Sequence, residues 1–335
     1  MSNKRELMKK VFNNQRAERV PIGFWYHYVS PKDHFRALED KDVLNAVIEG
    51  HKKMYQEMQP DFVKIMSDGF FGHPSLYNSN IQVAEDLYNI KAVGRDHPWI
   101  TEQVKFVKAI NDEFHNEVYT FYSVFSPIHC IRLYFEEFEA DNKKFPRLFL
   151  DNPEAMDYAA KEIAKDIDIF LDELFKEVEV DGIYYSVQEI QDERADKSFH
   201  EKYVHPTDLH ALQTIKKHSN TNILHICGYG EYRNKLDLFK KYDLSIINWA
   251  TYTENTSLKE GKEFFDGKVV IGGFDNNTGT LLDSGSDEEV EEYVKKLLED
   301  AGTQGVVIGA DCTISPNIPV ERFSFIRELG KKYTK

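Results

Sequence analysis

The sequence is short of cysteine, of basic charge and of long apolar runs, and each shortage excludes a class of protein. Its 335 residues include 3 cysteines (Cys130, Cys227 and Cys312), an odd number that argues against a disulfide framework and favours a reducing cytoplasm. Lys and Arg total 42 against 57 Asp and Glu, and no basic stripe appears, so we expect no nucleic-acid partner. No stretch approaches about 18 uninterrupted apolar residues, so we expect no membrane span.

The composition is that of a folded globular protein. Hydrophobic residues make up 41% of the chain and aromatic residues 13%, which argues against disorder. No glycine-rich, serine-rich or proline-rich linker divides the sequence, and its length falls within the range of one α/β barrel. We therefore expect a single domain over residues 1–335, with residues 1–19 as a helical N-terminal extension.

Short apolar runs rich in β-branched and aromatic residues recur along the chain and predict about eight strands. Their two-sided apolarity is typical of parallel strands that are covered on both faces. The predicted strands are residues 20–25, 61–66, 118–124, 182–186, 222–227, 244–249, 268–274 and 305–310.

Longer segments with helical periodicity separate most of these runs. One follows Asn152-Pro153, which reads as a cap with proline in the first turn. Another opens at a capping box and covers about residues 286–301, with Gly302 as its stop. A third covers about residues 42–58.

The alternation of strands and helices predicts a (β/α)8 barrel, also called a TIM barrel. A doubly wound sheet is the alternative. No G-x-G-x-x-G motif follows the first predicted strand, and Gly228-Tyr229-Gly230 alone is weak evidence for phosphate binding.

Polar residues follow the predicted strands, at the end where a barrel of this kind carries its active site. They are Tyr26-His27, Ser67-Asp68-Gly69, Gln188-Glu189, His225, Cys227, Asn248-Trp249, Asp275-Asn276-Asn277 and Asp311-Cys312. Among the carboxylates we select Asp68, Glu189 and Asp275 as candidate catalytic residues. Each has a structural alternative: Asp68 and Asp275 could cap turns, and Glu189 could belong to a solvated loop.

His225, Cys227 and Cys312 form the most specific set. Residues i and i+2 of a strand point to the same face, so His225 and Cys227 project together from a strand end that opens into a glycine-containing turn. Cys312 follows the last predicted strand and would face the same barrel mouth. One imidazole and two thiolates are a zinc ligand set with an open fourth position. The alternative is that all three are ordinary core residues, which is the interpretation we favour for Cys130.

A family resemblance rests on several sequence runs. ILHICGYG, INWA, VVIGGFDN, GADCTISPNIPVERF and the earlier PDFVKIMSDGFFG resemble the uroporphyrinogen decarboxylase superfamily, from about residue 20 to 330. The resemblance implies a (β/α)8 barrel. True decarboxylases carry an arginine-rich signature of the type M-R-Q-A-G-R near the N-terminus, whereas residues 24–29 of this chain (FWYHYV) contain no arginine.

The H-x-C-G motif with a late cysteine is instead similar to the zinc-dependent methyltransferase branch, which moves methyl groups between corrinoids and thiols. This resemblance implies Zn²⁺ bound by His225, Cys227 and Cys312, holding a small thiol as its thiolate to accept a methyl group from a corrinoid or another activated donor. Asp68, Glu189 or Asp275 would orient the substrate or accept the released proton. No D-x-H-x-x-G corrinoid motif is present, so a corrinoid donor would come on a separate protein or as a free cofactor.

Two features keep other functions open. Asp68 matches a catalytic aspartate of the decarboxylases, so a uroporphyrinogen decarboxylase is the alternative, although the acidic strand ends supply few cations for a substrate with several carboxylates. The late motif of the methyltransferase branch usually reads G-C-G, whereas this chain has Asp311-Cys312-Thr313, so the local turn should differ. A non-catalytic metal-binding or corrinoid-binding protein is the third hypothesis.

Overall fold

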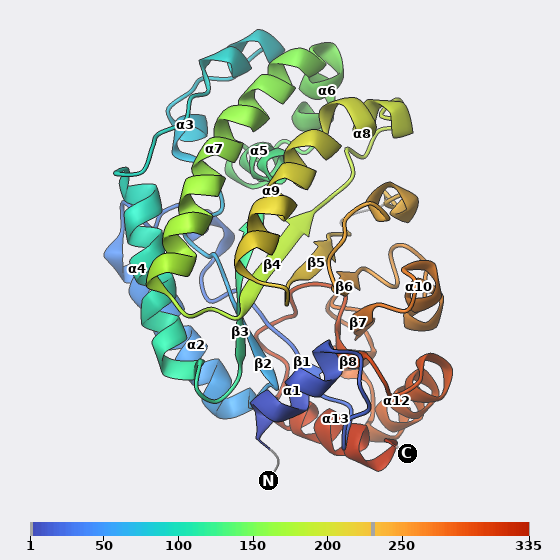
Figure 1. Ribbon diagram of the computed structural model, residues 1–335. Helices are drawn as coiled ribbons and strands as arrows, with labels where there is room; N and C mark the ends of the chain where they lie inside the picture. The colour runs from blue at the N-terminus through green and yellow to red at the C-terminus, as the bar shows by residue number, and fades with distance from the viewer. Residues whose placement is uncertain (1–2, 229–231, 335) are drawn as a thin grey trace.

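A barrel of eight parallel strands, surrounded by helices, forms the framework of the protein (Figure 1). The computed structural model describes residues 3–228 and 232–334, so Tyr229 and Gly230 of the glycine-containing turn lie outside the described residues. The strands are β1 (Ile22–Gly23), β2 (Phe62–Ile65), β3 (Tyr119–Phe125), β4 (Gly182–Val187), β5 (Ile223–Ile226), β6 (Ile246–Trp249), β7 (Val269–Phe274) and β8 (Val306–Ala310). Their order, β1-β8-β7-β6-β5-β4-β3-β2, confirms the predicted (β/α)8 barrel and excludes the doubly wound sheet.

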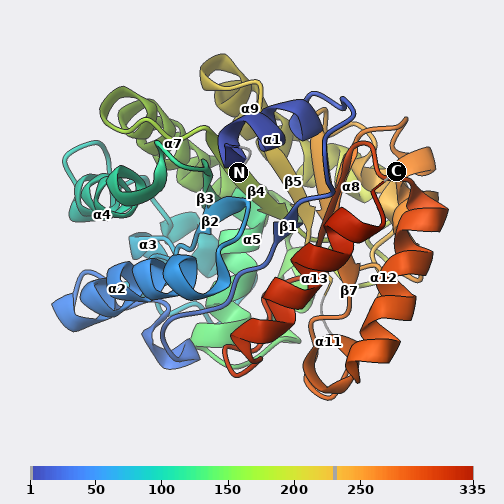
Figure 2. The same cartoon turned by 90° about the horizontal axis from the view of Figure 1, so that it is seen from below.

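Helices cover the outside of the barrel and connect its strands (Figures 1 and 2). The longer ones are α2 (Lys41–Met58), α4 (Pro98–Phe114), α7 (Pro153–Glu177), α9 (His205–His218), α12 (Asp287–Ala301) and α13 (Val320–Lys332). Shorter ones are α3 (Pro74–Tyr77), α5 (Pro127–Leu133), α6 (Lys144–Asp151), α8 (Lys197–Tyr203), α10 (Leu258–Phe264) and α11 (Leu281–Ser284). Short 3₁₀ or π segments add η1 (Pro31–Asp33), η2 (Ala84–Asn89), η3 (Tyr134–Phe138) and η4 (Leu236–Phe239).

The predicted helix signals act as expected at two helix starts. The side chain of Asn152 accepts a hydrogen bond from the Ala155 N–H and begins α7, with Pro153 in its first turn. Ser286 and Glu289 form the capping box of α12, and the helix ends at Gly302, whose φ of 77° favours glycine.

The seam between β1 and β2 differs from the prediction. A strand was expected over residues 20–25, but β1 is only two residues long. Pro21 has no N–H to donate, and its carbonyl accepts from the Ile308 N–H, while the Trp25 carbonyl accepts from the Ile314 N–H beyond β8.

Asp61 joins β1 to β2. Its N–H donates to the Ile22 carbonyl at 3.0 Å, and its carboxylate accepts from the Ile22 N–H at 2.8 Å. A side chain therefore completes the barrel where the strand is too short.

The N-terminal helix α1 (Lys4–Phe12) closes one end of the barrel. Its apolar residues Met8, Val11 and Phe12 pack in one cluster with side chains from the barrel interior, among them Phe62 and Phe121. A second and larger cluster fills the space between the strands and the outer helices. The helical extension predicted within residues 1–19 is therefore part of the barrel core, and it leaves the opposite end, at the carboxyl ends of the strands, as the mouth.

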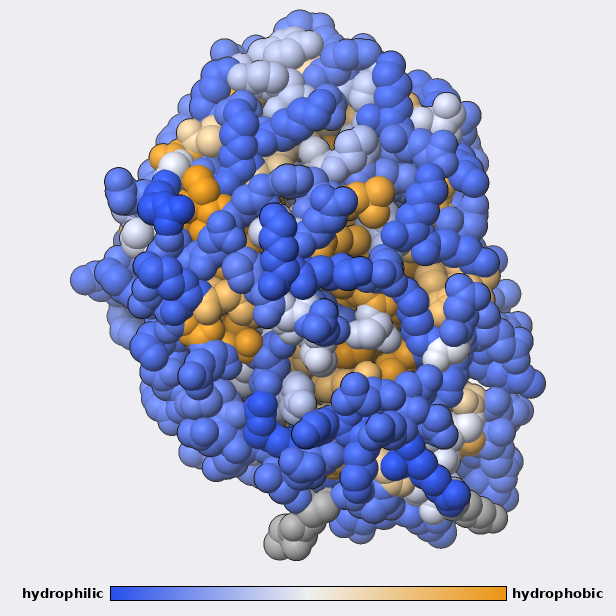
Figure 3. All heavy atoms as spheres, viewed as in Figure 1, coloured by the Kyte–Doolittle hydropathy of each residue, from blue (hydrophilic) through white to orange (hydrophobic). Residues whose placement is uncertain are grey.

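The surface visible in Figure 3 is mostly hydrophilic, with apolar side chains in scattered patches. Among the described residues, no helix has both the length and the apolar character needed to cross a bilayer. Cys130 is buried, as expected for a core residue, and burial raises the pKa of its thiol to about 12.

Candidate metal centre at the carboxyl ends of the strands

The three predicted zinc ligands converge at the mouth of the barrel. His225 lies in β5, Cys227 follows directly after it, and Cys312 follows β8. One ligand atom from each side chain lies within 4.8 Å of the other two. The i, i+2 spacing in β5 brings the first two together, and the closed barrel brings the third.

The spacing of these atoms fits a shared metal ion. Zn–S bonds of about 2.3 Å and Zn–N bonds of about 2.0–2.1 Å place two tetrahedral ligand atoms about 3.5 Å apart. The Cys312 Sγ lies 3.6 Å from the His225 Nε2. The donor types and their spacing therefore fit zinc, with one coordination position left for a further ligand.

Asn248, in β6, determines which nitrogen of His225 is free to bind a metal. Its amide donates to the carbonyls of Ile271 at 2.9 Å and Ala310 at 3.1 Å, so its Oδ1 must face His225 and act as an acceptor. The His225 Nδ1 lies 2.5 Å from this oxygen and therefore carries the proton. The Nε2 lone pair then points toward Cys312, which is the tautomer that a metal ligand requires.

The two cysteines share one proton between them. The hydrogen bond from Cys227 holds the pKa of Cys312 well below its ordinary value. The same hydrogen bond and burial raise the pKa of Cys227 well above it. Because one thiol already favours the thiolate, a cation replaces only one remaining proton when it binds the pair.

Lys64, in β2, is a buried cation inside the barrel near this pair. Its Nζ lies 4.0 Å from the centre of the Tyr184 ring and 5.1 Å from that of Trp25. Burial lowers the pKa of Lys64 to about 8, against the opposing effect of Cys312 and Cys227. Its signal in the sequence is a lysine in the middle of the apolar run FVKIM, and it was not among the predicted site residues.

The loops that carry Cys227 and Cys312 are held against the loop after β6. A Cβ added at Gly228 would lie 2.3 Å from the Cβ of Ala250, so only glycine allows this approach. The carboxylate of Asp311 accepts from the Thr251 hydroxyl at 2.6 Å and from the Tyr252 N–H at 2.9 Å. The aspartate that replaces the first glycine of the expected G-C-G motif therefore fixes the turn before Cys312.

Of the three candidate catalytic carboxylates, Asp68 lies in a second cluster at the mouth. Its Oδ1 lies 2.8 Å from the His27 Nδ1, and its Oδ2 accepts from the Tyr28 N–H at 2.8 Å. Burial opposes ionisation of Asp68, but the charge and hydrogen bond of His27 hold its pKa below the usual value. Burial lowers the pKa of His27. The negative charge and hydrogen bond of Asp68 raise this pKa by more, and the charge of Cys312 raises it further, so the net shift is upward. The negative charge of Cys312 thus reaches this cluster.

Glu189 and Asp275 have structural roles in the described residues. Glu189 is fully buried, accepts from the backbone N–H of Lys235 and from the Tyr232 hydroxyl, and holds the segment that precedes η4. Burial raises its pKa. Asp275 accepts from the backbone and the side chain of Asn277 at 2.9 and 2.7 Å, which is the turn predicted as its alternative.

Arg132 is a second buried cation that the sequence analysis missed. It lies in α5, is 1% exposed, and pairs with Glu136 at 2.8 Å and Gln191 at 3.0 Å. Burial lowers the pKa of Arg132, and the negative charges of Glu136 and Cys227 oppose that effect. No local pattern predicts its burial, because its position depends on how α5 packs behind β3.

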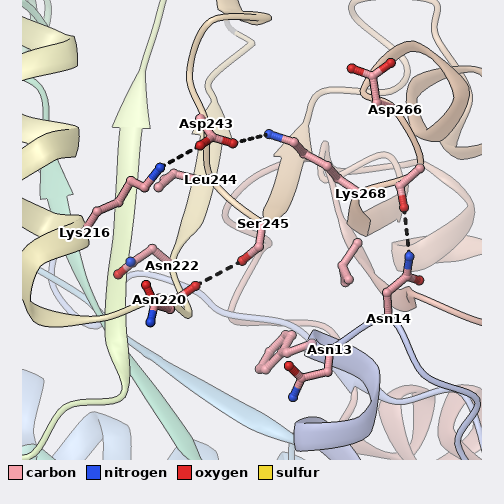
Figure 4. A pocket seen from close by; sticks show the side chains of 13 residues that line it. Asn13, Asn14, Lys216, Asn220, Asn222, Asp243, Leu244, Ser245, Asp266 and Lys268 are labelled. Carbon is pink, nitrogen blue, oxygen red and sulfur yellow. Dashed lines mark hydrogen bonds and ion pairs between the residues drawn. The ribbon is translucent and has the colours of Figure 1, made fainter.

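A cavity of about 490 Å³ lies at the opposite end of the barrel, beside the end of α1 (Figure 4). Its two lysines, Lys216 and Lys268, both pair with Asp243, at 2.6 and 3.4 Å. The remaining lining includes four asparagines and the apolar residues Phe12, Leu244 and Val269. This cavity holds none of the predicted site residues.

The chain belongs to the uroporphyrinogen decarboxylase (URO-D) family, whose model matches residues 3–333. Among curated proteins it is similar to the methylcobamide:CoM methyltransferase MtbA of Methanosarcina mazei. The two are 24% identical over 263 residues, which cover 78% of this chain and 72% of the relative. The predicted family is therefore confirmed, with a methyltransferase as a relative.

Solved structures with the same fold include two methionine synthases. A B12-independent methionine synthase from Shewanella sp. W3-18-1, bound to selenomethionine, superposes with a TM-score of 0.60 at 17% identity, covering 94% of this chain and 97% of that chain. A putative vitamin-B12 independent methionine synthase from Listeria monocytogenes gives a TM-score of 0.55 at 14% identity, covering 96% and 98%. At these identities the likeness shows the fold alone.

Proposed function

We propose that this protein is a zinc-dependent methyltransferase that transfers a methyl group to a small thiol. The observation that carries the proposal is the convergence of one imidazole and two cysteine sulfurs within 4.8 Å at the barrel mouth. The similarity to a methylcobamide:CoM methyltransferase supports the class of reaction.

His225, Cys227 and Cys312 hold the metal, and Asn248 keeps the His225 Nε2 unprotonated for it. When bound, the zinc supplies a Lewis acid that lowers the pKa of a small thiol and keeps it as the thiolate at neutral pH. The loops fixed by Gly228 and Asp311 hold the ligands in place before substrate arrives, so binding does not have to order them.

Lys64 balances the charge of the site. With zinc bound, the two cysteine thiolates would neutralise the divalent cation, and a thiolate from the substrate would leave one negative charge in excess. The Lys64 ammonium, held against Tyr184 and Trp25, is the buried positive charge that offsets it. In the transfer step the substrate sulfur forms a bond to the methyl carbon, and the donor keeps the electron pair of the bond that breaks.

The donor in this proposal is a corrinoid, on a separate protein or free, or another activated methyl compound. Three carboxylates are expected to orient the substrate or accept its proton. Asp68 is the strongest candidate, because its partner His27 lies close enough to Cys312 for the negative charge of that thiolate to raise the pKa of His27. Glu189 and Asp275 retain this role only as weaker candidates, since each already holds a loop. Three free cysteines, two of them ligands, suit a reducing cytoplasm.

The decarboxylase alternative rests on Asp68 and on the family itself. It requires several cations at the mouth for the carboxylates of the substrate. Lys64 is one, but Arg132 is engaged by Glu136. A non-catalytic role in metal or corrinoid binding is the remaining alternative, and both alternatives are outcomes of the same experiment.

The test incubates zinc-loaded protein with methylcobalamin and a panel of small thiols, and follows loss of the methylcobalamin absorbance and formation of the methyl thioether. We expect transfer with at least one thiol, and its loss in Cys312→Ser. The matched control is His210→Gln, which removes an exposed histidine paired with Asp168 outside the mouth and should leave the rate unchanged. Conversion of uroporphyrinogen to coproporphyrinogen would establish the decarboxylase instead. Tight corrinoid binding without transfer to any thiol would favour the binding protein.

A further inference from the structure

A second group of metal-ligating side chains lies on the other side of the same mouth. His27 follows β1, His34 follows η1, and Asp68 follows β2, and one ligand atom from each lies within 4.8 Å of the other two. Because β1 pairs with β8, this group adjoins the loop that carries Cys312. None of its members belongs to the first set, His225, Cys227 and Cys312, which we call the thiolate cluster. The second group is therefore a separate set of ligands.

His34 presents a nitrogen that has nothing to bind among the described residues. Its Nδ1 lies 2.9 Å from the carboxylate of Glu137 in η3, and because a carboxylate only accepts, this nitrogen carries the proton. The Nε2 is therefore a bare lone pair. This nitrogen is buried, because His34 is only 3% exposed, and it has no hydrogen-bond partner among the described residues. Such an orphaned acceptor is costly unless water or an ion occupies the space before it.

Asp68 and His27 supply the other donors. Asp68 is fully buried, and the charge and hydrogen bond of His27 hold its pKa below the usual value. The 2.8 Å between its Oδ1 and the His27 Nδ1 is close to the separation of about 3 Å expected for two ligands at about 2.0–2.2 Å from one metal ion and about 90° apart, as in octahedral coordination. A cation can therefore replace the proton that these two atoms share.

The surroundings make the group rigid. The centre of the Phe71 ring lies 4.3 Å from that of the His34 ring and 5.6 Å from that of the His27 ring. The backbone N–H of Phe71 donates to the His34 carbonyl. The Tyr28 N–H fixes the second oxygen of Asp68. The His27 side chain is 32% exposed and provides a path from solvent.

We propose that His27, His34 and Asp68 bind a second divalent transition-metal ion at the mouth, distinct from the zinc of the thiolate cluster. Two imidazole nitrogens and one carboxylate favour first-row divalent metals such as Zn²⁺, Co²⁺, Ni²⁺ or Fe²⁺ over Ca²⁺ and Mg²⁺, which prefer oxygen ligands. Glu137 orients His34 toward the ion by holding its other nitrogen. The ion places a positive charge beside the substrate position and takes the orienting role predicted for Asp68.

The experiment counts Co²⁺ equivalents bound to tag-free, metal-free protein by anaerobic calorimetry, with visible spectra of the same samples. The wild type should bind two equivalents, one with a thiolate-to-cobalt charge-transfer band. The double variant Cys227→Ala/Cys312→Ala, which leaves the second group intact, should bind one equivalent with only the weak absorption of nitrogen and oxygen ligation. Adding His27→Ala or His34→Ala to that variant should weaken this binding about 10-fold to 100-fold or more, whereas adding His210→Ala should not.

One equivalent in the wild type would overturn the proposal, as would none in the double cysteine variant. Binding by that variant that persists unchanged after loss of His27 or His34 would do the same. The first two outcomes involve no substitution in the second group, so they decide the matter even if His34→Ala unfolds. The charge-transfer band reports the thiolate cluster independently, so failure here leaves the proposed function untouched.

Discussion

The two ends of the barrel both carry buried or half-buried charges, but they arrange them in opposite ways. At the end closed by α1, two arginines face carboxylates: Arg5 pairs with Asp181, and Arg19 pairs with Asp61. At the mouth, Lys64 forms no ion pair with any described residue and lies instead against aromatic rings. The two arginine–carboxylate pairs stabilise the fold, whereas Lys64, which has no ion pair among the described residues, leaves a positive charge available to a ligand.

The cavity beside α1 illustrates the same difference. It measures about 490 Å³, but Asp243 pairs with both of its lysines. The thiolate cluster needs little space, because three ligand atoms within 4.8 Å define the position of one ion. Reactive groups that converge identify a site better than volume does.

The largest effect should come from removing a thiolate. Cys227→Ala and Cys312→Ser should each weaken zinc binding about 1,000-fold or more, beyond the 10-fold to 100-fold typical of residues that only orient a ligand. Asp243→Asn, in the cavity at the other end, should leave the affinity unchanged. Competition with a chromophoric chelator measures all three. Equal affinities in the cysteine variants and in Asp243→Asn would erase the distinction between the two ends.

Breaking the seam should produce the reverse pattern. Asp61 is fully buried, pairs with Arg19 and joins β1 to β2. Asp61→Asn leaves Arg19 without its partner and should lower the free energy of unfolding by about 3–5 kcal/mol. Zinc affinity measured below the melting temperature should not change. Urea unfolding followed by circular dichroism checks the first part, and a loss of metal affinity in folded Asp61→Asn would contradict the second.

Two buried asparagines, Asn248 and Asn222, lie at opposite ends of the barrel strands. Asn248 holds His225 at the mouth, whereas Asn222 accepts from the Ile183 N–H at 2.9 Å at the other end of the same strands. Asn248→Ala frees the His225 ring and should weaken zinc binding about 10-fold to 100-fold. Asn222→Ala should affect stability only. The chelator competition distinguishes the two, and a similar affinity in both variants would mean that Asn248 does not orient the ligand.

The smallest effect concerns pH. Burial raises the pKa of Asp208, in α9, to about 7, so the folded protein keeps this carboxyl protonated where an unfolded aspartate is ionised. Its contribution to stability is complete below about pH 4 and is lost as the pH rises through 7. Asparagine does not titrate, so Asp208→Asn does not lose stability in this way. The free energy of unfolding of Asp208→Asn relative to the wild type should therefore increase between about pH 4 and 7, by up to about 1.4 kcal/mol per pH unit.

Asp243 is the control for this prediction at the opposite end. Its hydrogen bond to Lys216 lowers its pKa, so it contributes stability above the unfolded pKa and loses it as the pH falls. Asp243→Asn should therefore change stability in the opposite direction with pH, and weakly, because the side chain is exposed. Urea titrations from pH 4 to 8 compare the variants. Parallel curves for Asp208→Asn and the wild type would show that burial does not hold this proton.

Local patterns in the sequence were sufficient to predict the strands, two helix caps and the thiolate cluster. Periodicity reports burial, capping residues act within one turn, and two ligands two residues apart in a strand point the same way. The short β1 could not be predicted, because its length depends on Pro21 and on hydrogen bonds with distant segments such as the Ile314 N–H. The side-chain link through Asp61 depends on the same long-range geometry.

The residues that surround the ligands were harder to predict. Asn248 stood among the polar strand ends, but its role follows only from its donation to Ile271 and Ala310 on two other strands. Lys64 was hidden in an apolar run, and His34 reaches Asp68 through a loop without periodicity. Lateral contacts between elements, rather than features of one element, assemble these parts of the site.

The zinc content and zinc coordination of the wild type, purified without added metal, decide whether His225, Cys227 and Cys312 form a metal centre. Elemental analysis should give about one zinc per chain or more, and X-ray absorption at the zinc edge should show two sulfur ligands and at least one imidazole nitrogen for the tightly held ion. Cys312→Ser should lose that ion. Zinc near zero in the wild type, indistinguishable from Cys312→Ser, or a zinc shell without sulfur, would contradict the assignment of His225, Cys227 and Cys312 as a metal centre.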